Sequence, residues 1–427
     1  MRSGPVLRLL QQPAVKVLLT AGLVYLLIFE YCSLRFWRDP HSAFFDIRDV
    51  FKWKYSLARE QQALNLTSTY NVPFDSALDA VKGRDRPLMC AALATVRRDN
   101  ADYFEASIGS LLSDLDARER RALHLSILFA NTDPTQHPSW GQKWVERLSD
   151  SVSSYNVSDA ELAHLRELEE KRDYYEKGVY DYVYLLNTCL ETGAPYIFIL
   201  EDDVILADGW MIKTLNGLTE LSQGQADRST AWLYLRLFFT ETSLSWQSTD
   251  YWYRNMPLAF FLVMVFGLTL LLAVRRRLPA SRRWLDNWTL AAVCFIIIPT
   301  FTALVYMVGK YSLCPLKGVI EMNIFGCCTQ GLVYPREQVP DLIAFLQDRK
   351  AGQTDSLIEE YASNSHLTRY AYAPQQIQHV GLKSSRGNLG INTQSTWAFW
   401  FEENDPQELK AEHEKLLAAH ETSWMLD

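Results

Sequence analysis

Three consecutive acids, Glu201, Asp202 and Asp203, are the residues of this sequence best suited to chemistry. They follow the apolar run Tyr196–Leu200 and precede a second one. Side chains alternate along an extended chain, so Glu201 and Asp203 should share one side while Asp202 faces the other. Clustered carboxylates repel one another unless a cation lies between them, and oxygen ligands suit Mg²⁺ or Mn²⁺. Such an ion can hold a diphosphate. A solvated acidic turn is the alternative.

The segments around these acids predict an α/β fold. Apolar runs typical of buried strands alternate with segments of helical spacing. The expected strands are Pro87–Val96, Leu123–Ala130, Tyr196–Leu206 and Ala231–Phe239, and the expected helices are Tyr103–Leu115, Asp159–Glu191 and Gly209–Leu221. This alternation indicates a wound, mostly parallel sheet. The acids would then lie at the carboxyl edge of the sheet, where such folds bind ligands.

Three apolar stretches have the length of membrane spans: Ala14–Leu34, Pro257–Val274 and Trp288–Val308. No small-x-small cleavage site follows the first, so we expect an uncleaved anchor whose amino terminus is cytosolic. Five arginines between positions 275 and 283 place the loop between the other two spans in the cytosol. The remainder of the chain would then face the lumen or the exterior.

This topology divides the chain into segments. We expect a cytosolic amino terminus at 1–13, the anchor at 14–34, a juxtamembrane connector at 35–86, a first catalytic part at 87–250, a second span at 257–274, a cytosolic loop at 275–287, a third span at 288–308, and a second catalytic part with a carboxyl-terminal helix at 312–427.

Charge excludes one class of partner, and the modification sites agree with a main domain outside the cytosol. The net charge of −8 argues against a nucleic-acid partner, which would require a basic face. Asn65 and Asn156 head glycosylation sequons on the lumenal side, whereas the sequon at Asn287 falls on the cytosolic loop and should stay unmodified.

Five of the seven cysteines would meet an oxidising compartment. Disulfide connectivity does not follow from the sequence. Cys327 and Cys328 are adjacent, and because a bond between neighbours strains the chain, we expect them to have different partners.

Acids at a strand end suggest a nucleotide-sugar transferase of the GT-A type. With its anchor, its acidic motif and a hairpin inserted into the catalytic domain, the chain resembles the Golgi GPI-glycan N-acetylgalactosamine transferases. More distantly, Thr95-Val96-Arg97-Arg98, Asp181-Tyr182 and Ile377-Gln378-His379-Val380-Gly381 resemble segments of the branching N-acetylglucosaminyltransferase IV group. The resemblance covers roughly residues 87–390. It implies a GT-A domain in a multi-pass Golgi membrane protein, with the catalytic part lumenal.

The resemblance also implies roles for individual residues. Glu201, Asp202, Asp203 and His379 would hold Mn²⁺ or Mg²⁺, and Asp202 would also reach the ribose. The UDP-sugar would contact Val96, Arg97, Arg98, Asp133, Asp181, Tyr182, Asp202, Lys383 and Ser384. The alternatives are a solvated loop for the two arginines, a helix-surface acid for Asp181 and a structural histidine on a strand for His379.

An inverting transfer requires a base that accepts the proton of the acceptor hydroxyl. Asp355 precedes a helix downstream of the acidic motif and is the favoured candidate, with Glu321 and Asp341 as rivals. Capping of that helix is the alternative role for Asp355.

The expected function is therefore transfer of N-acetylgalactosamine from UDP-GalNAc to a mannose of the GPI-anchor glycan, at the surface of the membrane lipid. The hairpin would keep the cleft close to this lipid-tethered acceptor. Two alternatives stay open: a UDP-HexNAc transferase with another acceptor, such as an N-glycan or a glycolipid, and a non-catalytic glycan-binding protein that retains the fold. The first of these differs only in the acceptor, which the sequence does not specify.

Overall fold

The computed structural model describes residues 11–72, 80–98, 102–224, 231–322, 328–381 and 396–419. The chain forms two compact units. The membrane unit comprises Met1–Phe51 and Thr242–Pro315, and the catalytic unit comprises Lys52–Glu241 and Leu316–Asp427. The predicted connector 35–86 is therefore divided between them. Its helix α3 (Tyr55–Tyr70) belongs to the catalytic unit, where Tyr55 and Arg59 are buried.

Three helices of the membrane unit are long and apolar enough to cross a bilayer: α2 (Pro13–Arg35), α11 (Met256–Arg277) and the stretch Asn287–Met307. The third consists of α12 (Asn287–Ala292), a π-helical turn (Val293–Ile297) and α13 (Ile298–Met307). Large apolar side chains remain exposed along all three, as expected for surfaces that lipid covers. The short helices α10 (Tyr251–Arg254) and α14 (Lys310–Leu313) flank the hairpin.

The three spans pack against one another. Tyr25 of α2 meets Phe301 of α13 edge to face, with ring centroids 5.4 Å apart. Gly267 lets α11 approach α13 so closely that a Cβ there would lie 2.3 Å from Cδ1 of Ile298. Beyond the ends of the hairpin, Lys310 forms an ion pair with Asp250 at 2.6 Å. The anchor and the hairpin thus form one packed bundle.

The catalytic unit is built on an eight-stranded sheet, ordered β3-β2-β1-β4-β8-β6-β9-β7. Its strands are β1 (Met89–Thr95), β2 (Leu123–Phe129), β3 (Ser151–Ser153), β4 (Tyr196–Leu200), β6 (Trp232–Arg236), β7 (Gly318–Glu321), β8 (Gly331–Pro335) and β9 (Thr368–Ala373). Only β7 and β8 run against the others. The wound, mostly parallel sheet predicted from the sequence is confirmed.

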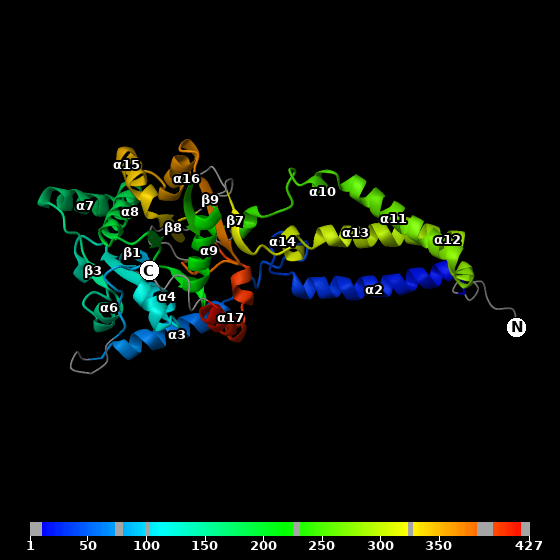
Figure 1. Cartoon of the computed structure of the whole chain (residues 1–427), viewed down its shortest axis with the longest axis horizontal. Coiled ribbons are helices and arrows are strands. Elements are labelled where there is room, and N and C mark those ends of the chain that lie inside the picture. The colour runs from blue at the N-terminus through cyan, green and yellow to red at the C-terminus, as the bar shows by residue number, and fades with distance from the viewer. Residues whose placement is uncertain are drawn as a thin grey trace. The chain divides into compact units, whose positions relative to one another are not determined.

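Helices cover both faces of the sheet (Figure 1). Alternate residues of β1 enter opposite cores: Met89, Ala91 and Leu93 enter one, Cys90 and Ala92 the other. The first core is closed by α3, α4 (Phe104–Leu112), α5 (Ala117–Ala122), α6 (Lys143–Leu148) and α9 (Trp210–Gly224). The second is closed by α8 (Tyr174–Glu191), α15 (Val339–Arg349) and α16 (Thr354–Asn364). Helices α7 (Asp159–Lys171) and α17 (Pro406–Ala419) complete the unit.

One disulfide joins the sheet to a helix that covers it. Cys90 of β1 is bonded to Cys189 of α8, with Cα atoms 5.6 Å apart. Cys328 also takes part in a disulfide. The prediction that Cys327 and Cys328 have different partners involves residue 327, which lies outside the described residues.

Two predicted elements are interrupted in the structure. The helix expected over Asp159–Glu191 ends at Lys171, because Arg172 adopts a left-handed conformation with φ of 56°, and α8 then begins at Tyr174. The strand expected over Tyr196–Leu206 stops at Leu200 and resumes as β5 (Val204–Leu206). Strand β5 pairs with β10 (Ile377–His379) in a separate two-stranded sheet. The acids therefore occupy a turn between two sheets.

Candidate active site

The acidic turn is held in place from three sides. The Ser107 hydroxyl of α4 lies 2.8 Å from the carbonyl oxygen of Asp202 and accepts the Val204 N–H at 3.0 Å. Across the turn, the Val380 N–H donates to the carbonyl of Asp203 at 2.9 Å. Thr329, ahead of β8, donates its hydroxyl to Glu201 at 2.7 Å. The backbone that carries the acids is thus fixed by its neighbours.

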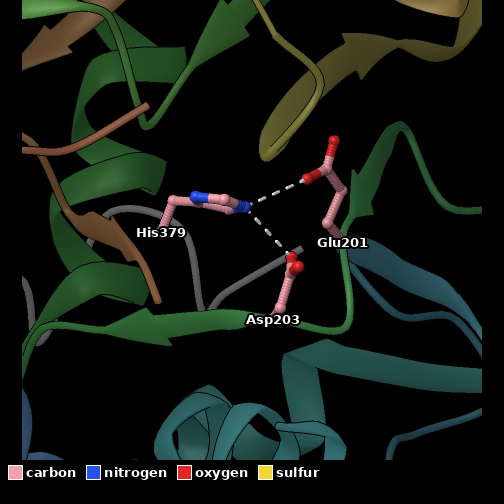
Figure 2. Close-up of side chains that lie close together, drawn as sticks. All are labelled: Glu201, Asp203 and His379. Carbon is pink, nitrogen blue, oxygen red and sulfur yellow. Dashed lines mark ion pairs between the residues drawn. The ribbon is translucent and has the colours of Figure 1, made fainter. Parts of the chain in front are cut away.

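Glu201, Asp203 and His379 converge on one point (Figure 2). One ligand atom from each lies within 4.8 Å of the others. Nε2 of His379 is 3.5 Å from Oδ1 of Asp203 and 3.9 Å from Oε2 of Glu201. Strand β10 delivers the histidine opposite the turn because His379 pairs with Val204 of β5.

The three residues fit a divalent cation. Oδ1 of Asp203 is buried and has no hydrogen-bond partner among the described residues. An orphaned carboxylate oxygen is costly in the interior unless a cation meets it. Two carboxylates with one imidazole suit a first-row divalent ion such as Mn²⁺. Glu201 is about a third exposed, so solvent or a phosphate can reach the same point.

Asp202 does not join this cluster, as the alternation of side chains requires. Its carboxylate turns back to the end of β1, where it accepts the Thr95 hydroxyl at 2.7 Å and pairs with Arg98. We therefore correct the expectation that Asp202 ligates the metal. Arg98 also lies 3.1 Å from Oδ2 of Asp203, so one guanidinium serves both acids.

Burial and charge act differently on the two aspartates. Burial raises the pKa of Asp202, and the positive charge of Arg98 offsets this only in part. Burial would also raise the pKa of Asp203, but His379 and Arg98 outweigh it and hold that pKa below its usual range. Asp203 is accordingly anionic and ready to meet a cation.

The predicted donor contacts divide into two groups. Val96 and Arg97 follow β1 directly, and the Arg97 N–H donates to Asn131 just beyond β2, at 2.9 Å. Asp133 caps the short 3-10 turn Pro134–Gln136 after that strand. Arg98, Val96, Arg97 and Asp133 therefore share the carboxyl edge with the acids. Lys383 and Ser384 lie outside the described residues.

Asp181 and Tyr182, neighbours on α8, point in different directions. Asp181 accepts Lys177 Nζ at 2.9 Å and the Tyr155 hydroxyl, and Lys177 also donates to the Ala130 carbonyl beyond β2. The Tyr182 hydroxyl instead lies in the second core, 2.7 Å from that of Tyr334. The expectation that Tyr182 contacts the donor is therefore wrong, because one step along the helix turns its side chain into the core.

Of the candidate bases, the structure brings Asp355 towards the acids. Asp355 lies in the first turn of α16 and accepts the backbone N–H of Cys328 at 3.2 Å, one residue before the Thr329 that binds Glu201. The N-cap of that helix is Gln353, so Asp355 is not the capping residue.

The two rival bases lie elsewhere. Glu321 ends β7, at the outer edge of the sheet and four strands from β4. Asp341 lies in the first turn of α15, which follows β8. The end of β8 pairs with the start of β4, so this helix begins at the edge of the sheet opposite the acids. The structure brings neither to the acidic turn.

The asparagines of the two sequons that are predicted to be lumenal are both exposed. Asn156 lies in the loop before α7, and Asn65 lies on α3. The sequence predicts no role for Ser107 or Thr329, and Thr95 enters only as part of the Thr95–Arg98 resemblance. Ser107 and Ser110 on the otherwise apolar face of α4 were the available signal, because small polar residues on a buried face need partners.

Similarity to known proteins was then assessed. Among curated proteins no match to the chain was found. The solved structure of the mannosyltransferase Ktr4p from S. cerevisiae has 9% sequence identity to this chain, covers 91% of it and 96% of that chain, and gives a TM-score of 0.30. Its complex with GDP has 10% identity, covers 92% and 98%, and gives 0.28. At these TM-scores neither structure bears on the function.

The model of one family, GPI-N-acetylgalactosamine transferase PGAP4, matches residues 89–378. This is more than half of the chain, from the start of β1 to the residue before His379, and it includes the acidic turn and the hairpin. The resemblance predicted from the sequence is thereby confirmed. The chain belongs to the GPI-N-acetylgalactosamine transferase PGAP4 family, and it is a membrane-associated glycosyltransferase that adds N-acetylgalactosamine to the GPI glycan.

Proposed function

We propose that the chain uses UDP-GalNAc as donor, with Glu201, Asp203 and His379 holding Mn²⁺ and a mannose of the GPI glycan as acceptor. The convergence of three ligand atoms on one point carries this proposal, because one of them is a buried carboxylate oxygen without a hydrogen-bond partner among the described residues. A bound cation would stabilise the negative charge that grows on the departing diphosphate.

The residues of the chain divide the remaining work. Arg98 holds both aspartates and places a positive charge at the end of β1, beside Asp203 of the proposed metal site. Asp355 accepts the proton of the acceptor hydroxyl while the hydroxyl oxygen bonds to the anomeric carbon. The bond from that carbon to the phosphate oxygen breaks, and UDP leaves with the electron pair. The anomeric centre inverts.

The proposed location is the Golgi membrane, with the catalytic unit lumenal and the arginine-rich loop cytosolic. Asn156 or Asn65 should then carry a glycan that endoglycosidase removes, whereas Asn287 should carry none. A glycan on Asn287 would contradict this topology.

Purified full-length protein in detergent tests the function. UDP-GalNAc hydrolysis and transfer to a GPI glycan should both require Mn²⁺ and should both cease in EDTA. Unchanged transfer in EDTA would exclude the metal site. Hydrolysis of UDP-GalNAc without transfer to the GPI glycan would exclude that glycan as the acceptor. A non-catalytic glycan-binding protein would show neither reaction.

A further inference from the structure

The strand that delivers His379 is held on its other face by a buried glutamine. Gln378 is 0% exposed, and alternation directs its side chain away from the acids. Its Oε1 accepts the Ala398 N–H at 2.8 Å, and its Nε2 donates to the Ala398 carbonyl at 3.0 Å. The same Nε2 lies 3.0 Å from Oε1 of Glu402. One side chain thus connects β10 to two residues of the segment Trp397–Glu402.

Glu402 is itself fully buried and is held by the start of a helix. Its Oε2 accepts the backbone N–H groups of Lys54 at 2.7 Å and Ser56 at 3.2 Å, and its Oε1 accepts the Ser56 hydroxyl. Lys54 is the N-cap of α3 but provides no side-chain cap, so Glu402 supplies it from the far end of the sequence. Favourable interaction with the helix dipole strengthens this attachment.

His379, by contrast, has no orienting hydrogen-bond partner in the part of the chain that the structure describes. Its Nδ1 is buried without a hydrogen-bond partner among the described residues. A histidine that binds a metal is ordinarily oriented by a hydrogen bond from its second nitrogen. Strand β10 is three residues long, and β5 is its only strand partner among the described residues. The direction of the imidazole must therefore come from the strand, and Gln378 and Glu402 fix the strand from its other face.

We propose that Gln378 and Glu402 are positioning residues for the metal ligand His379. They anchor β10 to the amino end of α3, so that Nε2 of His379 remains opposite Asp203. This inference rests on the metal site proposed above. It predicts that loss of Gln378 weakens metal binding, although Gln378 touches neither the metal nor the donor.

The chain provides a matched control. Gln375 is 4% exposed and precedes β10, and its side chain also makes hydrogen bonds to a buried glutamate and a backbone N–H. Its partners are Glu241 at 2.7 Å and the Phe239 N–H at 3.0 Å. Replacing Gln375 by alanine removes comparable bonds four positions from His379 and outside β10.

The test is a Mn²⁺ titration of full-length protein in detergent, in which electron paramagnetic resonance reports free Mn²⁺. Gln378→Ala should raise the dissociation constant for Mn²⁺ by about tenfold, and saturating Mn²⁺ should largely restore UDP-GalNAc hydrolysis. Gln375→Ala should lower the melting temperature comparably and bind Mn²⁺ as the wild type does. Glu402→Gln preserves side-chain volume and should also raise the dissociation constant for Mn²⁺. This variant takes the place of Gln378→Ala if Gln378→Ala does not fold.

The outcomes separate the two proposals. If wild type and His379→Ala bind Mn²⁺ equally, the metal site is excluded, and the positioning role with it. If His379→Ala loses Mn²⁺ but Gln378→Ala and Glu402→Gln bind as tightly as wild type, only the positioning role is excluded. An equal loss in Gln378→Ala and Gln375→Ala would also exclude it, because general loosening would then explain the effect.

Discussion

Two buried histidines of the catalytic unit each face two carboxylates, and their surroundings differ. His379 faces Asp203 and Glu201 at the acidic turn. His413 of α17 faces Asp208, five residues further along the chain from Asp203, and Glu119 of α5. The two histidines are 7% and 4% exposed. Residue types and burial are thus nearly the same.

The geometry distinguishes them. The nitrogens of His413 lie on different acids, with Nδ1 2.7 Å from Asp208 and Nε2 2.9 Å from Glu119. Glu119 also accepts the backbone N–H groups of Ile212 at 3.1 Å and Asp116 at 3.0 Å. At the other cluster, both acids face the same nitrogen of His379 at 3.5 and 3.9 Å, beyond a good hydrogen bond.

The comparison shows how a structural cluster differs from a set of ligands. The hydrogen bonds of His413 satisfy the histidine and join α17 to α5 and to Asp208, two residues after β5. The atoms around His379 leave a buried oxygen and a buried nitrogen without partners among the described residues. A buried, unpartnered Asp203 oxygen at the point where the three side chains converge, and not burial or charge, distinguishes the proposed metal site from the structural cluster among the described residues.

We call Glu201, Asp203 and His379 the open cluster, and Glu119, Asp208 and His413 the closed cluster. The largest expected effect is on catalysis at the open cluster. Asp203→Asn keeps the shape of the side chain but removes the charge that a cation requires. Transfer should fall by roughly a thousandfold or more, equivalent to several kcal/mol in the transition state. Radiolabelled GalNAc transfer to a GPI glycan measures it.

The matching change at the closed cluster is Asp208→Asn, which should leave transfer by the folded protein within a few-fold of wild type. If both variants lost activity equally while remaining folded, the distinction between the clusters would fail. Circular dichroism and melting temperature confirm folding in each case.

Much of this contrast between the two histidine clusters cannot be predicted from the sequence. The apolar runs of β1, β2 and β4 and the three spans were predictable, because each follows from local periodicity or length. Alternation also placed Glu201 and Asp203 on one side. The distances that separate a ligand set from a structural cluster depend on β10 and α17, which arrive from far along the chain. For His413 the sequence predicts only a place in the carboxyl-terminal part of the chain, where a helix is expected.

The failures have the same origin. Asp202 was assigned to the metal because its family motif was read as a unit, whereas Thr95 and Arg98 turn its carboxylate towards β1. Tyr182 was assigned to the donor together with its neighbour, although consecutive residues of a helix face different directions. The strand β7 and the split at Arg172 depend on tertiary pairing and on one left-handed residue, neither of which a short window of sequence reveals.

The next effect in size is on stability at the closed cluster. His413→Ala would leave Asp208 and Glu119 buried without their shared cation, and loss of one partner from a buried ion pair costs about 3–5 kcal/mol. His379→Ala should lower the free energy of unfolding far less, because the His379 side chain makes few good hydrogen bonds that the substitution would remove. Chemical unfolding of both variants measures the difference. Equal destabilisation would mean that His379 is as structural as His413.

A smaller effect is expected at Gly381, next to the open cluster. A Cβ at this position would lie 1.9 Å from Oδ2 of Asp203, so Gly381→Ala must displace the carboxylate. Mn²⁺ affinity should fall by about tenfold, comparable to other changes that disturb a ligand indirectly. Gly224→Ala is the control, because nothing lies within 4 Å of that position. Unaltered Mn²⁺ affinity in folded Gly381→Ala would show that Asp203 does not need its present position.

The smallest effect is the pH dependence of the closed cluster. Burial would lower the pKa of His413, but its hydrogen bonds to Asp208 and Glu119 outweigh burial and raise that pKa to about 10. In the unfolded chain the pKa is about 6.5. The stabilisation by protonated His413 is therefore complete below about pH 6.5, declines as pH rises because only the folded state retains the proton, and is lost above about pH 10. Between pH 7 and 9 wild type should lose up to about 1.4 kcal/mol more per pH unit than His413→Gln, which carries no titrating group there. Urea unfolding of both proteins at several pH values measures this difference, and parallel curves would show that His413 is neutral in the folded state.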